Sequence, residues 1–208
     1  MSKILEQSGG LNDYYHSYVD YLHKLLDRLD GKSVEKVVEV FLQARKNGKT
    51  IYFVGNGGSA ATASHFSQDL AEVGNKANCE GFRTLSLTDN TSFITAAGND
   101  CGYESIFTKQ MKFLFGEGDV LVGISASGNS QNVVNAVKLA KERGGVAVAL
   151  VGFDGGELGK FADHVVHLQT PKGEYGPVED AHMILDHIIT SYLMCKLKSE
   201  ESSGSWRF

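Results

Sequence analysis

The chain has 208 residues, which is enough for one well-buried domain and short for two. Twenty basic side chains against 25 acidic ones give a formal charge of −5, which excludes the global basic field of a nucleic-acid-binding protein. Cys79, Cys101 and Cys195 lack metal-finger spacing, no apolar signal segment is apparent, and the longest apolar run is far below the roughly 20 residues that cross a bilayer, so we expect a cytoplasmic protein.

Two amphipathic helices are expected ahead of the first strand. Apolar residues recur at helical spacing from Leu11 to Leu29. A second helix should begin near Ser33, which can cap its N-terminus, and end at Asn47 and Gly48. Because the first stripe is more apolar than one domain can bury, we expect it to contact other chains.

Beyond these helices, short apolar runs bounded by glycine alternate with helical stretches. This alternation predicts an α/β fold with a five-stranded, doubly wound parallel sheet, whose ligands gather at the carboxyl ends of the strands. We expect residues 1–198 to form a single domain that includes the leading helices, and residues 199–208 to form a flexible tail. The expected strands are residues 51–54, 84–87, 120–124, 146–151 and 165–168, and the expected helices are residues 59–73, 129–143 and 178–197.

A glycine-rich loop, Gly55-Asn56-Gly57-Gly58-Ser59, stands directly between an expected strand and an expected helix. Glycines at such a place let backbone N–H groups and the helix N-terminus face an anion. A simple tight turn explains the loop alone equally well. The spacing matches neither a Walker loop nor a dinucleotide-binding loop.

A serine-rich loop follows a second expected strand and precedes the helix expected from Asn129. The hydroxyls of Ser125, Ser127 and Ser130, beside free helix N–H groups, form a neutral cradle suited to a phosphate monoester. A serine-rich helix cap is the alternative. Two such loops at adjacent strand ends favour the phosphate site.

Ionisable side chains lie on two of the expected helices. His65 and Asp69 are four residues apart and share one helix face, as ion ligands or an acid/base pair would, although a solvated surface pair is the alternative. On the last helix, Glu179 and His187 are eight residues apart, about 12 Å along the axis. They can meet one ion only by reaching toward each other, or another subunit supplies one of them.

The same segment of the last helix contains further polar and apolar residues. Glu179, His182, and Asp186 or His187 fall on two polar stripes, and at least one of these residues is expected to be merely solvated. Core positions are expected at Met183, Ile184 and Ile188.

Together these motifs resemble the sugar isomerase (SIS) fold and, in their combination, the bacterial phosphoheptose isomerase family, which acts on sedoheptulose 7-phosphate. The likeness covers about residues 51–193 and includes the two leading helices. The resemblance implies that the serine loop holds the sugar phosphate and that the glycine loop and a Gly-Asn-Asp segment contact the sugar. The substrate-binding residues it implies are Asn56, Gly57, Gly58, Ser59, Asn99, Asp100, Ser125, Ala126, Ser127, Ser130 and Glu179.

The resemblance also implies a divalent metal, often zinc, at His65, Asp69, Glu179 and His187. This sequence departs from the family pattern at several positions. Asp69 is one methylene shorter than the usual Glu, and Glu179 has a carboxylate where the family has an amide. In addition, a hydroxyl is replaced at Ala126, an arginine at Val73 and an aspartate at Gly176.

The implied reaction moves a proton between C1 and C2 of a ketose phosphate through an enediol, which requires a base at carbon and an acid at oxygen. We expect Glu179 or Asp69 to be the base and His187 to be the acid, in a homotetrameric enzyme of heptose and surface polysaccharide biosynthesis. Isomerisation of another phosphosugar is an alternative. A non-catalytic SIS protein that binds a phosphosugar or a partner protein is another, against which the retained ionisable residues argue.

Overall fold

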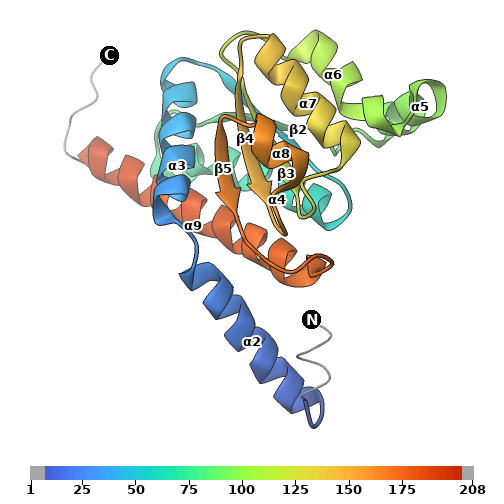
Figure 1. Ribbon diagram of the computed structural model, residues 1–208. Coiled ribbons are helices and arrows are strands. Elements are labelled where there is room, and N and C mark those ends of the chain that lie inside the picture. The colour runs from blue at the N-terminus through green and yellow to red at the C-terminus, as the bar shows by residue number, and fades with distance from the viewer. Residues whose placement is uncertain (1–7, 203–208) are drawn as a thin grey trace.

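The computed structural model describes residues 8–202 and has five parallel strands in the order β2-β1-β3-β4-β5 between two layers of helices (Figure 1). The five-stranded parallel sheet and its flanking helices are therefore confirmed. The elements are α2 (Leu11–Asp27), α3 (Gly31–Lys46), β1 (Thr50–Val54), α4 (Gly58–Ala77), β2 (Arg83–Ser86), α5 (Thr91–Cys101), a 3₁₀ turn (Tyr103–Ser105), α6 (Ile106–Leu114), β3 (Val120–Ser125), α7 (Gln131–Glu142), β4 (Val146–Val151), α8 (Gly156–Phe161), β5 (His164–His167) and α9 (Tyr175–Ser202).

The core has two halves because neighbouring side chains of a strand point to opposite faces of the sheet. In β1, Ile51 and Phe53 pack with residues of α3, α4 and α9, whereas Tyr52 and Val54 pack with residues of α6, α7 and α8. The chain crosses from β1 to β2 on one side and later returns to β3 on the other. The carboxyl ends of β1 and β3 therefore form the switch point at which ligands bind in such sheets.

Two sequence expectations need correction at helix ends. Ser33 does not cap α3; the cap is Asp30, whose carboxylate accepts a hydrogen bond from the N–H of Lys32 at 3.0 Å, and Ser33 lies within the first turn. The last helix runs through Ser202, so the boundary expected after residue 198 falls inside it. Residues 203–208 of the expected tail lie outside the described residues.

The sequence analysis did not assign three helices. Two of them, α5 and α6, lie between β2 and β3, and the short α8 lies between β4 and β5. In the described part of the chain, no helix is long and apolar enough to span a membrane.

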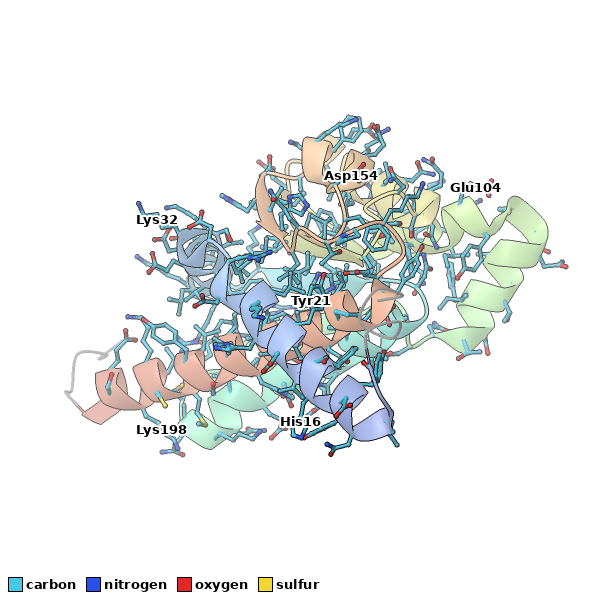
Figure 2. All side chains as sticks on the ribbon, turned by 60° about the horizontal axis from the view of Figure 1, so that its bottom comes forward. His16, Tyr21, Lys32, Glu104, Asp154 and Lys198 are labelled. Atoms are coloured by element: carbon cyan, nitrogen blue, oxygen red, sulfur yellow. The ribbon has the colours of Figure 1, made fainter. Side chains whose placement is uncertain are left out.

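The helix α2 leaves the body of the molecule, as Figure 1 shows, and crosses the start of α9 (Figure 2). There the hydroxyl of Tyr18 donates to Asp180 Oδ2 at 2.5 Å, and that of Tyr21 donates to Glu174. Leu25 is the only buried residue of the helix. The apolar stripe is thus covered only in its second half: Leu22, Leu26 and Leu29 are half-buried against the core, whereas Leu11, Tyr15 and Val19 are exposed.

His182 on α9 is fully buried, and neither ring nitrogen has a hydrogen-bond partner. Burial lowers the pKa of this imidazole to about 4, although the nearby Val151 carbonyl opposes the change. The residue is therefore a neutral core histidine.

Replacing His182 with leucine should flatten the acid limb of the stability curve. The imidazole of the unfolded chain takes up a proton near pH 6.5, and that of the folded chain only near pH 4. His182 therefore costs no stability above pH 6.5, whereas about 3 kcal/mol of the free energy of unfolding is lost as the pH falls from 6.5 to 4. Urea unfolding of wild type and His182→Leu at pH 7 and pH 4.5 measures this, with exposed His16→Gln as control. An equal loss in wild type and His182→Leu would contradict it.

Candidate active site

Three serine hydroxyls meet at the carboxyl end of β3. The Oγ of Ser125 lies 3.2 Å from that of Ser130 and 3.4 Å from that of Ser127. Ser130 is the cap residue of α7 but makes no side-chain capping bond, so its hydroxyl stays in the cluster. The expected cradle of hydroxyls beside a helix N-terminus is therefore present in the structure, with the chemistry of an anion site.

The backbone of the serine loop is fixed by its neighbours. Gly128 has φ +64°, and a Cβ there would lie 2.1 Å from the carbonyl oxygen of Gly155. Its N–H donates to Ser125 Oγ at 3.2 Å, and the carbonyl of the buried Ala126 accepts from the N–H of Gly152 at 3.0 Å. Ala126 thus joins the loop to the end of β4 rather than offering a side-chain donor.

The glycine loop after β1 is joined to the serine loop through a pair of amides. Asn56 Nδ2 donates to Asn132 Oδ1 at 2.8 Å, and Asn132 Nδ2 donates to Asn56 Oδ1 at 2.9 Å. Asn56 Oδ1 also accepts from the Tyr103 hydroxyl at 3.0 Å. Both acceptor positions of Asn56 are therefore used, so this residue chiefly fixes the loop, and one amide N–H is left for a substrate.

Glu179 lies at the other side of the glycine loop. A Cβ on Gly58 would come within 2.3 Å of the Glu179 carboxylate, so the missing side chain at this first residue of α4 makes room for it. Ser59, the next residue, is buried. Burial, and then the charge of Asp180, raise the pKa of Glu179. Glu179 is thus a partly buried carboxylate with a raised pKa beside the glycine loop.

A cluster of histidine and aspartate side chains lies further along the paired helices α4 and α9. His65 and Asp69 come from α4, and Asp186 and His187 come from α9; one possible ligand atom of each lies within 4.8 Å of the others. His65 Nδ1 is 2.9 Å from Asp186 Oδ2, and His187 Nε2 is 3.9 Å from Asp69 Oδ2. This donor set fits a divalent transition metal.

The membership of this cluster differs from the sequence expectation. His65, Asp69 and His187 are together as expected, but Glu179 is not in the group and Asp186 takes part instead. The physical reason is the helix pitch, which puts Glu179 two turns before Asp186, about 10 Å along the axis. Burial raises the pKa of Asp186 to about 6, against the effect of His65. Asp186 is therefore buried and not the solvated residue that the sequence allowed.

The serine loop and the cluster open onto different clefts of the chain. A cavity of about 190 Å³ beside the serine loop is lined by Ser127 and Asn129, and also by Lys172, a cation that the sequence analysis missed. A second cavity, of about 270 Å³, lies between α4 and α9 and is lined by Asp69 and His187.

The structure does not bring Asn99 and Asp100 to either cleft of this chain. Both are exposed near the end of α5, where Asn99 Nδ2 donates to Asp100 Oδ1 at 2.8 Å. Two polar residues that the sequence analysis did not select, Asn132 of α7 and Tyr103 of the 3₁₀ turn, donate hydrogen bonds to Asn56 of the glycine loop. In the sequence, Asn132 is marked only as a polar residue on the otherwise apolar, buried face of α7. The sequence gives no comparable signal for Tyr103.

The fold and the strand-end loops define a SIS domain, and the SIS domain family matches residues 13–152. A phosphoheptose isomerase of Aliarcobacter butzleri (strain RM4018) is 39% identical over 156 residues, which are 75% of this chain and 81% of that protein. Another, from Geotalea daltonii, is 38% identical over 186 residues, or 89% and 94% of the two chains. The chain therefore belongs to the phosphoheptose isomerase family of SIS domain proteins.

Solved structures agree with this assignment. The phosphoheptose isomerase structure from Neisseria gonorrhoeae superposes with a TM-score of 0.77 at 34% identity, and the match covers 86% of this chain and 94% of that one. The resemblance inferred from the sequence motifs is thus confirmed.

Proposed function

We propose that the protein isomerises sedoheptulose 7-phosphate to an aldose heptose 7-phosphate of the D-glycero-D-manno type, for heptose and surface polysaccharide biosynthesis. The observation that carries this proposal is the cluster of three serine hydroxyls at the carboxyl end of β3. This cluster is connected through the glycine loop to the Glu179 carboxylate, whose pKa is raised. A phosphate held at one end of a sugar positions its other end for proton transfer. The three free cysteines support a reducing, cytoplasmic setting.

In this proposal Ser125, Ser127 and Ser130 hold the phosphate through their hydroxyls. The Glu179 carboxylate removes a proton from C1 of the ketose and returns it to C2, with an enediol between the two steps. Its raised pKa makes it a stronger base than an ordinary glutamate. Asp69, the other candidate base, belongs to the histidine and aspartate cluster.

The enediolate oxygen needs positive charge or a proton donor. His187 is the chain's own donor, and its Nε2 lies 3.9 Å from Asp69 Oδ2. A divalent cation, for which we propose zinc held by His65, Asp69 and His187, would supply the positive charge directly. A His187 nitrogen that binds a cation cannot also donate a proton. Proton donation by His187 and binding of a cation are therefore two alternative ways to stabilise the negative enediolate oxygen.

We further propose that the active site is completed between chains of a homotetramer. Glu179 and His187 are eight residues apart on one helix, about 12 Å. His187 lines the cavity between α4 and α9, whereas Glu179 lies beside Gly58 of the glycine loop. Contact between chains would place the cluster of one chain opposite the serine loop and Glu179 of another.

Apolar surface supports this association. Leu11, Tyr15 and Val19 of α2 are exposed, and an apolar groove of about 630 Å³ lies between α3 and α9. Among the residues that line it are Leu26, Leu29, Val34, Val38, Leu42, Leu185, Ile188, Ile189 and Tyr192. Light scattering should give four times the 22.5 kDa mass of the chain, whereas a 22.5 kDa species at micromolar concentration would contradict the proposal.

A shared site predicts complementation between inactive variants. At a substrate concentration near the wild-type KM, Ser127→Ala/Ser130→Ala and His187→Ala should each turn over little substrate alone. After mixing and subunit exchange, some sites would combine the intact serine loop of one chain with the intact His187 of another. Recovered turnover is the expected result, and mixing wild type with each variant calibrates the exchange. Absence of recovery despite verified exchange would show that each site lies within one chain.

The substrate is tested with ketose phosphates of five, six and seven carbons. We expect kcat/KM to be highest for sedoheptulose 7-phosphate, with an aldose heptose 7-phosphate as the product in NMR spectra. Higher kcat/KM for a shorter sugar would favour the alternative isomerase. Binding without turnover of any of them would favour a non-catalytic SIS protein.

A further inference from the structure

We propose that Asn132 is a positioning residue, which holds the glycine loop at a fixed place beside the serine loop through its amide pair with Asn56. The inference rests on the proposed function in one respect, namely that the serine loop holds the phosphate of a sugar whose chain runs past the glycine loop. It gives a role in that reaction to a residue of α7 that belongs to neither loop.

The amide pair lies where the two loops leave the sheet. β1 and β3 are neighbouring parallel strands, and Val54 at the end of β1 pairs with Gly123 of β3. Beyond the strands, the glycine loop leads into α4, which packs on one face of the sheet, and the serine loop leads into α7, which packs on the other. The two loops therefore separate, and the side chains of Asn56 and Asn132 join them across the switch point.

The positions of the two asparagines in the chain show what the pair holds together. Asn132 follows Ser130, a member of the hydroxyl cluster, by two residues. Asn56 precedes Gly58 by two residues, and the Glu179 carboxylate lies against Gly58. The pair thus connects a point close to the phosphate site with a point close to the carboxylate that acts on the sugar.

Stability does not require an amide at position 132. Asn132 is only 2% exposed, and the other buried residues of α7 are valines and alanines. A buried amide is costly unless it is hydrogen-bonded, and replacing both partners of such a pair by apolar groups of the same shape can be neutral for stability. The two bonds to Asn56, at 2.8 and 2.9 Å, therefore fix the relative position of the loops rather than add stability.

The 3₁₀ turn belongs to the same network. The Tyr103 hydroxyl donates to Asn56 Oδ1 at 3.0 Å. Asn135, three residues after Asn132 on α7, donates from Nδ2 to the carbonyl of Glu104 in that turn at 3.2 Å. α7 thus holds both the glycine loop and the turn that carries Tyr103. Because Asn56 accepts from two donors and donates once, the loop cannot shift without breaking these bonds.

The experiment uses two ligands that are bound but not turned over. Inorganic phosphate reports the serine loop alone. The heptitol 7-phosphate made by reducing sedoheptulose 7-phosphate reports the phosphate and the sugar chain together, and it has no carbonyl to isomerise. Calorimetry with the full chain gives both dissociation constants, and the ratio of the phosphate constant to the heptitol phosphate constant measures what the sugar chain adds.

Three variants are compared with wild type. Asn132→Leu keeps the size of the side chain and removes both hydrogen bonds to Asn56, whereas Tyr103→Phe removes one donor to Asn56. Gln110→Leu is the matched control, because it removes another buried amide, which donates to the carbonyls of Leu87 and Ile106 and to neither loop. Circular dichroism checks that each variant is folded.

We expect wild type to bind the heptitol phosphate more tightly than phosphate. Asn132→Leu should lower the ratio about 10-fold at nearly unchanged phosphate affinity, and its kcat with the ketose should fall about 10–100-fold, because a small misplacement of one loop is costly for a bound substrate. Tyr103→Phe should lower the ratio by about threefold, since Asn56 keeps both bonds to Asn132. Gln110→Leu should keep the wild-type ratio, whatever its melting temperature.

Equal weakening of both ligands in Asn132→Leu would mean that the residue supports the serine loop alone, and an unchanged ratio would mean that the pair positions nothing. Either result overturns the proposal, as does a wild type that binds the heptitol phosphate no more tightly than phosphate. If Asn132→Leu does not fold, the ratio in Tyr103→Phe decides in the same way. A wild type with the expected ratio that converts no ketose phosphate would refute the proposed reaction and leave the role of Asn132 intact.

Discussion

Replacing Glu179 with glutamine is expected to lower kcat by about 10²–10⁴-fold while changing KM little. The amide keeps the size of the side chain beside Gly58 but cannot accept a proton from carbon. Steady-state kinetics with sedoheptulose 7-phosphate measure the effect. Glu142→Gln, at the exposed far end of α7, is the control and should behave as wild type.

The same variant distinguishes the two carboxylates that the sequence offered as base. If Asp69 were the base, Glu179→Gln would keep most of its kcat and Asp69→Asn would lose activity even with His187 intact. Loss of affinity for substrate in Glu179→Gln, with kcat preserved, would instead place Glu179 in substrate binding alone.

The double variant Ser127→Ala/Ser130→Ala is expected to raise KM strongly. A hydrogen bond to a charged acceptor contributes about 1.5–3 kcal/mol, so each hydroxyl lost from a bound phosphate weakens binding about 10–150-fold, and the two effects need not add. Ser125 is left intact because it is buried and its Oγ accepts from the N–H of the buried Gly128, so that it supports the loop itself.

Stability should change little in the double variant, since the replaced hydroxyls cluster at a strand end and not in the apolar core. The one backbone hydrogen bond that is lost runs from the N–H of exposed Asn129 to Ser127 Oγ. Exposed Ser199→Ala is the matched control. An unchanged KM, with the melting temperature preserved, would remove the serine loop from the phosphate site.

The parallel sheet could be predicted because its strands are continuous apolar runs buried on both faces, such as Val146–Val151. The helices α5 and α8 were not predicted, for two different reasons. In α5 only Ala97 is buried, so no apolar stripe marks it, and α8 is six residues long, too short to show a period.

The last helix shows why site residues were harder to predict than strands. Ile188 was expected in the core but is 50% exposed in the α3–α9 groove, while the buried positions of that stretch include Ala181, Leu185 and Ile189. The same rotation of the helix buries Asp186. Periodicity alone could not fix it, because buried polar residues blur the apolar stripe that sets the phase.

Proton transfer on a seven-carbon ketose phosphate is tested most directly by running the reaction in D₂O with the purified protein. The account predicts that sedoheptulose 7-phosphate yields an aldose heptose 7-phosphate, part of it with deuterium at C2, because a carboxylate that carries a proton between carbons exchanges it with solvent. Glu179→Gln should give neither product nor exchange at a comparable rate. Unchanged substrate with wild type, or a product free of deuterium at every conversion, as a direct hydride shift would give, would contradict the account.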